Sequence, residues 1–511
     1  MPTSNPYMGF SIPLLGVQAD RHPTKVDPEG LVEAENCLYR DGNFASRPGL
    51  IAFGASVGVR SLGFMQYDDP SEIRRVVQGT TLGWLRWDKA TLAWVSITDP
   101  TNGLTGSATS QVIFRVFQQA GINYVLGVNA TNRAKSWDSN IAHNYADIAG
   151  ETRVPRCIGV AADHVLLGGF TDGPQEIEAS NNTDFTTGYS TATHLKRFGE
   201  TPGDVVGIVE FGDFDAVVYK TDAIYLATPL SGETPFAYAP KFLGLPGPVS
   251  PAAIVKLPSG GHAALCEDGS VRVFTGSDFE SVGPHIQRFV ADNWLYTDRA
   301  QSWGYYDELR RELWFIYPHK ATGALTHGIC LSVPSWALYP VRWATMIMTA
   351  GGHFATASEV TIGEIALPLG QVAQSIGSFG QDRRVTLLGS SLGQVCEPAG
   401  NDDLGAAIPG LFEYGLMGIE NMTSWKTAVC GDHGFARTPA NQVVSVFVGA
   451  VVAGELRTMS PAATINLVGA GPLRTDHRTT GRMLTLRYEW SGLQPVVFLG
   501  SSVGYKLLGA R

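Results

Sequence analysis

Residues 261–276 read GHAALCEDGSVRVFTG and carry the clearest β-hairpin signal in the sequence. A short apolar run ending at Cys266 precedes Asp268-Gly269, a dipeptide that accepts positive φ at both centres of a tight turn. Residues 270–274 then alternate polar and apolar side chains, as a half-buried strand does. One hairpin is only marginally stable in water, so repetition of this unit would set the architecture of the chain.

The pattern of two apolar strands around a turn recurs along most of the chain. The turns centre near residues 81, 131, 173, 222, 269, 324 and 391, so most units lie about 40–55 residues apart, with a longer last step. Each unit has room for about four short strands. A small sheet cannot bury both faces alone, whereas sheets arranged radially cover one another. The sequence therefore predicts an all-β fold, a β-propeller of about six or seven blades.

The two ends of the chain differ from the repeats. Residues 1–33 contain five prolines, which remove backbone donors and disfavour helix, and they predict an extended arm, either tethered on a neighbour or loose. Residues 34–400 are assigned to the propeller. Residues 401–511 are rich in longer strands and predict a C-terminal β-rich region, either a separate domain or the part that closes the propeller.

Composition narrows the class of protein. Hydrophobic residues make up 44% of the chain and charged residues only 16%, as in a well-cored globular protein. The net charge of −10 argues against a surface that coats nucleic acid, but it is compatible with DNA that passes without being held. We expect no membrane span, because no apolar run is long enough, and no secretory signal at the N-terminus.

Cysteine and histidine spacing predicts no metal site. Six cysteines are scattered without a CxxC pair and indicate buried thiols in a reducing cytosol: Cys37, Cys157, Cys266, Cys330, Cys396 and Cys430. His319 and His327, eight residues apart and without an HExxH motif, are interpreted as surface or hydrogen-bonded side chains. Residues 401–403, Asn-Asp-Asp, lack the alternating carboxylates of a calcium loop and are interpreted as a solvated turn.

Nucleophile and carboxylate motifs also lack their required context. Gly-x-Ser-x-Gly occurs three times, around Ser56, Ser391 and Ser502, but a nucleophile elbow needs a strand-to-helix turn in a parallel sheet, and helices are scarce. These motifs are therefore interpreted as hairpin turns. Nothing in the sequence makes two carboxylates face one bond, as a glycosidase requires; the acids considered are Glu178, Asp215 and Glu267.

Three further features have plain interpretations. The Trp-Asp pairs at 87–88 and 137–138 lack the upstream Gly-His partner of Trp-Asp repeats. Arg474, Arg478 and Arg482 could contact phosphate, but a solvated loop before a strand is the favoured interpretation. His262 and Cys266 are predicted to be packing positions. The sequence thus predicts no catalytic, cofactor-binding or metal-ligating residue, and no cofactor.

Several segments resemble the propeller proteins of phage tails. Residues 34–50 (AENCLYRDGNFASRPGL) resemble their Asn…Gly…Arg-Pro-Gly opening, and residues 213–251 resemble a central blade ending in Gly-Pro-x-Ser. Residues 267–286 resemble the next blade, and residues 479–490 with 504–511 resemble the closing strands. These motifs are turns and packing residues, so they indicate a fold more directly than a chemistry.

The family that these segments resemble includes the tail nozzle, or tail tubular, proteins of short-tailed bacteriophages. It implies a structural virion protein with no catalysis, made in the host cytoplasm, that forms a homohexameric ring at the distal end of the tail. The implied partners are the tail adaptor protein, tail fibres, and genomic DNA that passes through the channel without sequence-specific binding. The implied function is genome retention and DNA ejection. Two alternatives stay open: a tail-associated propeller glycan hydrolase, and a propeller that binds a receptor or fibre.

Overall fold

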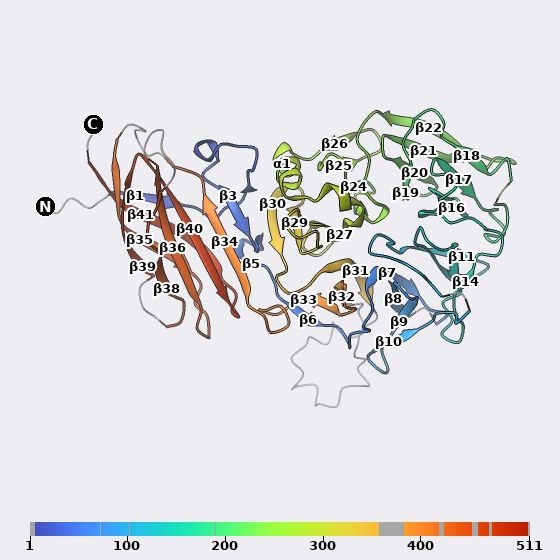
Figure 1. The fold of residues 1–511 in the computed structure, drawn as a ribbon, viewed down its shortest axis with the longest axis horizontal. Coiled ribbons are helices and arrows are strands. Elements are labelled where there is room, and N and C mark those ends of the chain that lie inside the picture. Colours follow the sequence, from blue (N-terminus) through green and yellow to red (C-terminus); the bar gives the residue numbers. More distant parts are fainter. Residues whose placement is uncertain are drawn as a thin grey trace.

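The structure is a computed structural model that describes residues 6–71, 73–101, 103–189, 191–356, 383–417, 424–451, 458–469 and 473–508. The chain forms two β-rich units side by side, a ring of small sheets and a two-sheet sandwich (Figure 1). The predicted all-β propeller is confirmed: seven groups of four antiparallel strands surround one axis, and each group is a blade.

Six blades each use four consecutive strands. Blade 1 is β7 (Ser61–Asp68), β8 (Arg74–Thr80), β9 (Trp84–Asp88) and β10 (Ala93–Ser96), and blade 2 is β11 (Ile113–Gln119), β12 (Ile122–Val128), β13 (Lys135–Trp137) and β14 (Ala146–Asp147). Blade 3 is β15 (Cys157–Ala161), β16 (His164–Gly168), β17 (Glu176–Ala179) and β18 (Leu195–Arg197), and blade 4 is β19 (Val205–Phe211), β20 (Asp215–Lys220), β21 (Ala223–Pro229) and β22 (Phe236–Leu243). Blade 5 is β23 (Ile254–Lys256), β24 (His262–Leu265), β25 (Val271–Phe274) and β26 (Phe279–Ser281), and blade 6 is β27 (Trp303–Asp307), β28 (Glu312–Tyr317), β29 (His327–Ser332) and β30 (Ala337–Arg342).

Blade 7 closes the ring with strands from both ends of the chain. It joins β31 (Met348–Thr356), β32 (Arg383–Ser390) and β33 (Val395–Pro398) to β6 (Leu50–Ala52), which pairs antiparallel with β33. The first strand of each blade is innermost, and neighbouring innermost strands contact one another around the axis, through η2 (Pro251–Ala253) between blades 4 and 5. Hydrogen bonds between early and late residues therefore hold the ring shut.

The hairpin of residues 261–276 forms β24 and β25, the two central strands of blade 5. The expectation of positive φ at both turn centres is wrong. Gly269 has a φ of +79°, but the φ of Asp268 is not positive. The loop has three residues with a left-handed Gly at its end, a common hairpin form. The Asp268 carboxylate accepts hydrogen bonds from the Ser270 N–H at 3.0 Å and hydroxyl at 2.5 Å, which holds the turn.

The only α-helix in the described part of the chain is α1 (Pro284–Asn293), which follows blade 5 and buries Ile286 and Val290. Three 3-10 turns complete the helical elements of the described residues: η1 (Pro23–Lys25), η2, and η3 (Tyr296–Gln301).

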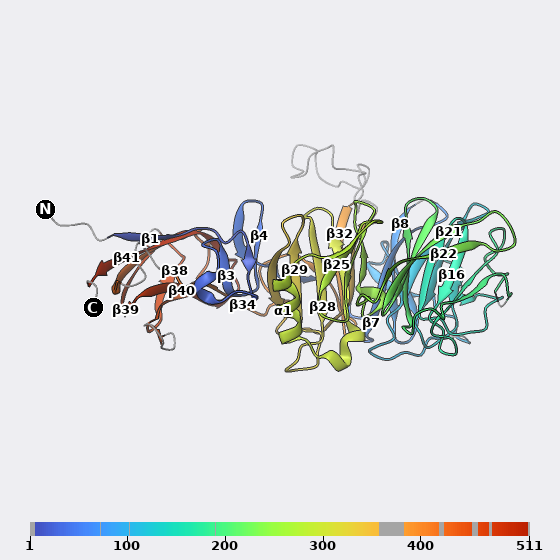
Figure 2. The same cartoon turned by 90° about the horizontal axis from the view of Figure 1, so that it is seen from above.

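Both chain ends build the sandwich. One sheet runs β39 (Arg474–Gly481), β35 (Lys426–Phe435), β41 (Val497–Leu507), β5 (Asn43–Ser46) and β4 (Cys37–Arg40), with β1 (Tyr7–Phe10) also paired to β41. The other contains β3 (Gly30–Glu35), β34 (Ile408–Tyr414), β40 (Met483–Gly492) and β36 (Val443–Val451), flanked by β37 (Thr458–Met459) and β38 (Ala463–Asn466). Figure 2 shows this unit beside the propeller rather than across its axis.

The domain boundaries expected from the sequence need correction. Residues 37–46, expected at the start of the propeller, form the β4–β5 hairpin of the sandwich, because β5 pairs with β41. Residues 7–10, expected in an extended arm, form β1 and pair with β41 within the chain. A hairpin has the same local pattern in either unit, so only its distant partner strand decides where it belongs.

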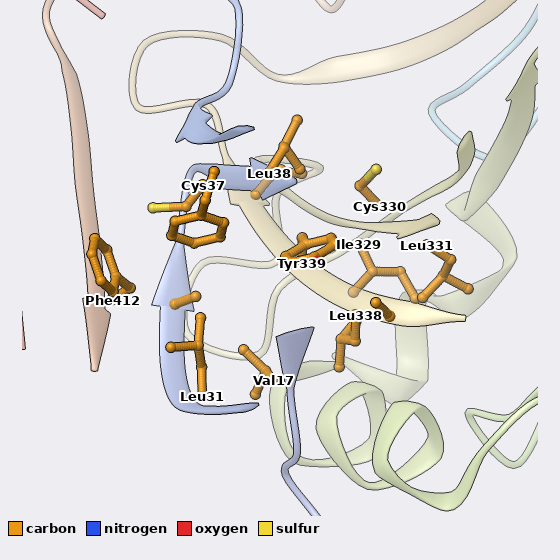
Figure 3. Packing of buried hydrophobic residues seen from close by; sticks show 14 of the residues in the cluster. Val17, Leu31, Cys37, Leu38, Ile329, Cys330, Leu331, Leu338, Tyr339 and Phe412 are labelled. Atoms are coloured by element: carbon orange, nitrogen blue, oxygen red, sulfur yellow. The ribbon is translucent and has the colours of Figure 1, made fainter. Parts of the chain in front are cut away.

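One continuous sheet joins the two units. The short strand β2 (Gly16–Val17) pairs in parallel with β30 of blade 6 and with β3 of the sandwich. Figure 3 shows the side chains packed over this joint, where Val17, Leu31 and Leu38 approach Leu338 and Tyr339. All five are buried in one core that extends from the sandwich into the propeller. The two units are thus one packed body rather than domains on a free linker.

The six cysteines are free and buried, and burial raises the pKa of the thiols of Cys37, Cys157, Cys266, Cys330 and Cys396. The thiolate is the reactive form, so we expect almost no thiol to react with Ellman's reagent in the native protein within minutes, and all six to react in guanidinium chloride. Fast labelling of two or more thiols in the native protein would contradict this packing.

Candidate functional site: the propeller axis and the junction between the units

One end of the propeller axis opens into a polar cup with a volume of about 580 Å³. Residues from the loops that enter the innermost strands, and from the turns between the second and third strands of blades 2, 4 and 5, surround it. The uncharged polar residues are Ser107, Thr109, Ser110, Gln111, Thr131, Thr221, Ser250 and Thr297, and the charged ones are Arg156, Asp204, Glu267 and Arg299. The cup is therefore suited to a hydroxyl-rich or otherwise polar ligand rather than an apolar one.

The charges of the cup are matched in pairs. An Arg299 Nη donates to Glu267 Oε2 at 3.1 Å, and the Arg299 guanidinium lies 4.1 Å from the Tyr296 ring centroid. Arg156 and Asp204 form the second pair. Their charged atoms are 3.9 Å apart, and both side chains are more exposed to solvent than those of Arg299 and Glu267. The cup therefore has little net charge, and Arg299 is held in place by Glu267 and Tyr296.

Below the cup, the axis narrows to a cavity of about 190 Å³. Side chains of the innermost strands line it, among them Phe64, Ile113, Ile254 and Trp303. This volume holds a few water molecules at roughly 30 Å³ each. Duplex DNA, whose major groove alone is about 12 Å wide, does not fit through the axis of one propeller.

The second distinctive feature is a buried network at the junction, centred on Arg47, whose side chain is almost fully buried. Its Nε donates to Asn36 Oδ1 at 2.9 Å, and its two Nη atoms donate to both carboxylate oxygens of Asp403 at 2.9 and 2.5 Å. The remaining donors reach the carbonyls of Pro48 and Arg342, at 3.0 and 2.9 Å. All five N–H groups of the guanidinium are satisfied, which a buried arginine requires.

Asn36 ties the same network to the sandwich and to blade 6. Its amide Nδ2 donates to the Pro409 carbonyl at 2.7 Å, and its Oδ1 accepts from the Arg342 N–H at 2.7 Å. Asn36 has a φ of +59°, a left-handed conformation that Asn tolerates better than most residues. We call Asn36, Arg47 and Asp403 the junction network.

A second ion pair crosses the junction nearby. Arg40 on β4 forms a two-point pair with Glu312 on β28, at 2.5 and 2.6 Å, and the Trp314 indole N–H donates to the same carboxylate at 3.1 Å. Charge-assisted two-point contacts of this kind set orientation as well as adding stability.

The interpretation of residues 401–403 as a solvated turn is wrong for Asp403. Its carboxylate is buried in the junction network, because its partner Arg47 is 356 residues away in the sequence and no local pattern reports the pair. The other two members, Asn36 and Arg47, lie in the segment 34–50, whose Asn and Arg-Pro-Gly indicate from the sequence only a resemblance.

Of the three Gly-x-Ser-x-Gly serines, Ser56 lies in the loop between β6 and β7, one lies in a turn, and Ser502 lies on the antiparallel strand β41. Ser56 donates to the Leu392 carbonyl at 2.9 Å, and Ser391 lies in the turn after β32. In the third motif it is Ser501, not Ser502, that meets a histidine: Ser501 Oγ lies 2.8 Å from His433 Nδ1. Burial lowers the pKa of His433 to about 3, so this ring is a weak base.

His319 and His327 are brought together by the fold. Their rings stack with centroids 3.8 Å apart, and burial lowers the pKa of both, to about 4 for His327. Both rings are therefore neutral at pH 7. No group of three or more potential metal ligands occurs among the residues that the structure describes.

His262 and Cys266 are buried in blade 5. His262 Nε2 lies 2.8 Å from the Glu210 carbonyl, and its Nδ1 lies 2.8 Å from the Tyr219 hydroxyl, so both ring nitrogens are used. The structure places these two residues in the packing of the blade, away from solvent.

The charged residues singled out from the sequence do not converge. Glu267 lines the cup, Asp215 lies on β20, and Glu178 lies on β17 in another blade. Arg474 and Arg478 lie on the exposed side of β39, where Arg474 is 3.9 Å from Asp432.

Glu178 has a different partner, Glu151, and both side chains are buried. Oε2 of each carboxyl has no hydrogen-bond donor, and burial together with the nearby Glu178 carboxylate raises the pKa of Glu151. Arg153 donates to Glu178 Oε1 at 2.9 Å, which compensates one negative charge. Both carboxyls are buried, so they are not accessible to a glycosidic bond.

This pair predicts a pH dependence of folding stability. Burial, with Glu178 opposite, raises the pKa of Glu151 from 4.5 to about 7. Between these values the unfolded chain has released the proton and the folded chain retains it, so stability falls as pH rises from 4.5 to 7. We expect Glu151→Gln, whose amide can donate to Glu178, to raise the free energy of unfolding at pH 8 by about 1–2 kcal/mol.

Urea titrations of both proteins at pH 5 and pH 8 measure this effect. The exposed variant Glu233→Gln is the matched control and should follow the unmodified protein at both pH values. Equal pH dependence in Glu151→Gln and in the unmodified protein would contradict the raised pKa of Glu151.

No family model matches the chain, and no curated protein matches it. The chain is similar to the extracellular domain of a candidate hybrid two-component system of B. thetaiotaomicron, with a TM-score of 0.40, 10% identity, and coverage of 68% of this chain and 39% of that one. A candidate one-component system of the same organism gives a TM-score of 0.39 at 10% identity, with coverages of 84% and 48%. The chain thus spans less than half the length of either neighbour.

Proposed function

We propose that this chain is a structural virion protein, the tail nozzle of a short-tailed bacteriophage. The observation that carries the proposal is the junction network. The segment that resembles the opening of phage tail propeller proteins, residues 34–50, supplies Asn36 and Arg47, and these two residues lock the sandwich to the propeller. A rigid subunit of this kind suits a protein that bears mechanical load in a tail.

The size of the axial cavity supports a channel between subunits rather than through one. Since duplex DNA does not fit the 190 Å³ cavity, a DNA channel requires several copies around a common lumen. In this proposal the copies form a homohexameric ring attached to the tail adaptor protein, with tail fibres docked outside. Genomic DNA passes without sequence-specific contact. The net charge of −10 is compatible with a channel wall that binds the DNA only weakly.

Light scattering and negative-stain electron microscopy of the purified protein, and of the parent particle, test the proposal. We expect a hollow six-fold ring, and the same ring at the distal tip of a tail. A strict monomer at all concentrations, together with a parent particle that lacks the protein at its tail tip, would overturn it.

The polar cup favours a second candidate, a propeller that binds a receptor or a fibre through a polar ligand on its axis. Arg156 and Arg299, each beside a carboxylate, offer paired donors and acceptors for a glycan. Binding of host-surface oligosaccharides that is lost in Arg299→Met would support it. Release of reducing sugar would instead indicate the glycan hydrolase alternative.

A further inference from the structure

The end of the propeller opposite the cup exposes a set of large apolar side chains. This end is built by the turns that join the first strand of each blade to the second, and the third strand to the fourth. In blades 2, 3 and 4, five apolar side chains in or next to these turns are between 38% and 65% exposed: Ile122, Ile141, Leu195, Phe214 and Leu230. Apolar side chains gathered on one face, rather than scattered singly, indicate a surface that another molecule covers.

The turns of these three blades form one continuous surface. The Phe185 N–H, in the loop before β18 of blade 3, donates to Gln119 Oε1 of blade 2 at 3.4 Å. The ring of His164, at the start of β16, lies 5.3 Å from the ring of Phe236 of blade 4, measured between centroids. Blade 3 therefore contacts both of its neighbours on this side. We define the turn face by its segments: residues 119–122, 138–145, 161–164, 180–189, 191–195, 211–215 and 230–236.

The turn face is acidic as well as apolar. Its segments contain no lysine and no arginine. They contain six acids: Asp138, Asp163, Asp184, Asp213, Asp215 and Glu233. A surface of this charge repels the phosphates of DNA and favours a protein surface that presents basic residues beside apolar ones.

A second copy of this chain presents such a surface on the outside of its sandwich. β39 is the edge strand of its sheet, and Arg474 and Arg478 alternate along it with buried residues, so both point away from the core. Lys506 on β41 is also exposed, and the apolar side chains Tyr7 and Leu507 are about half exposed in the same sheet. We call these five residues the β39 surface. Two exposed acids compensate only part of its charge: Asp432 and Asp476.

These two surfaces cannot meet within one copy. The sandwich forms one end of the molecule, and blades 2–4 lie at the far side of the propeller (Figure 1). A contact between them therefore joins the head of one copy to the tail of the next. Such a contact uses two different surfaces, and it closes into a ring when the rotation between successive copies returns to the first one.

We propose that the turn face of one copy binds the β39 surface of the next, with Arg474 and Arg478 opposite the acids of blades 3 and 4. The exposed apolar side chains of both surfaces are buried in this contact. The inference rests on the ring assembly proposed above, and it assigns the two surfaces that build the ring.

Charge reversal tests the contact by light scattering of the full chain. Asp163→Lys with Asp213→Lys, or Arg474→Glu with Arg478→Glu, should each raise the concentration needed for assembly by about tenfold or more, because like charges then face each other. An equal mixture of the two double variants should assemble again, since each turn face then meets a β39 surface of opposite charge. Asp292→Lys is the control, because Asp292 is an exposed acid on α1, outside both surfaces, and it should assemble like the unmodified protein.

Three outcomes would overturn the inference, and they separate it from the nozzle proposal. Rings that form unchanged in both double variants, or a mixture that does not recover assembly, would overturn this contact and leave the ring itself standing. A strictly monomeric unmodified protein would overturn the contact and the ring together. Duplex DNA that binds the unmodified ring and is released by Arg474→Glu with Arg478→Glu, with the ring intact, would assign the arginines to DNA instead.

Discussion

Arg47→Met should lower the free energy of unfolding by about 3–5 kcal/mol, the range for breaking a buried ion pair by removing one partner. Methionine fills much of the same space but donates no hydrogen bond. The substitution leaves the Asp403 carboxylate buried without its cation and leaves Asn36 Oδ1 with one donor fewer. Urea titration followed by tryptophan fluorescence measures the effect, and Trp343, 5.6 Å from the guanidinium, reports on the junction directly.

Arg21→Met is the matched control for this prediction. Arg21 pairs with Asp27 at 2.6 Å, but both side chains are 43% exposed, so the loss should stay below about 1 kcal/mol. The double variant Arg47→Met with Asp403→Leu should be less destabilised than Arg47→Met alone, because the stranded charge is gone. Equal stabilities of Arg47→Met and Arg21→Met would contradict the role of the junction network.

Gly49→Ala should destabilise the protein by about 2–4 kcal/mol and loosen the closing strand of the propeller. A Cβ at Gly49 would lie 2.1 Å from the Asp402 carbonyl oxygen and 2.4 Å from its nitrogen. Both are backbone atoms, and Leu50 N, at the start of β6, donates to that same carbonyl at 2.7 Å. The clash therefore shifts β6 away from β33. We expect a lower urea midpoint and faster proteolysis within residues 47–53.

Gly199→Ala provides the comparison, because nothing lies within 4 Å of a Cβ at that exposed position. It should change stability by no more than about 0.5 kcal/mol. If Gly49→Ala kept both the urea midpoint and the protease resistance of the unmodified protein, closure of the ring by β6 would not depend on this close approach.

These two variants probe features that local sequence could not reveal. The motif Arg-Pro-Gly at 47–49 reads as the end of a hairpin, yet it supplies both the buried guanidinium and the close approach to residue 402. Asp403 reads as a turn residue, and only its ion pair with Arg47 makes it a core residue.

The sequence by itself determined the all-β class, the blade repeat and the approximate number of blades. Hairpin turns and alternation of side chains are local signals, with a period of two along a strand, so they survive in any sheet that buries one face. The tertiary structure alone decided which strands share a sheet. Thus the residue 37–46 hairpin lies in the sandwich and β6 closes blade 7, because strand pairing is set by partners hundreds of residues away. The polar sites follow the same rule: the junction network and the axial cavity exist only where distant segments meet.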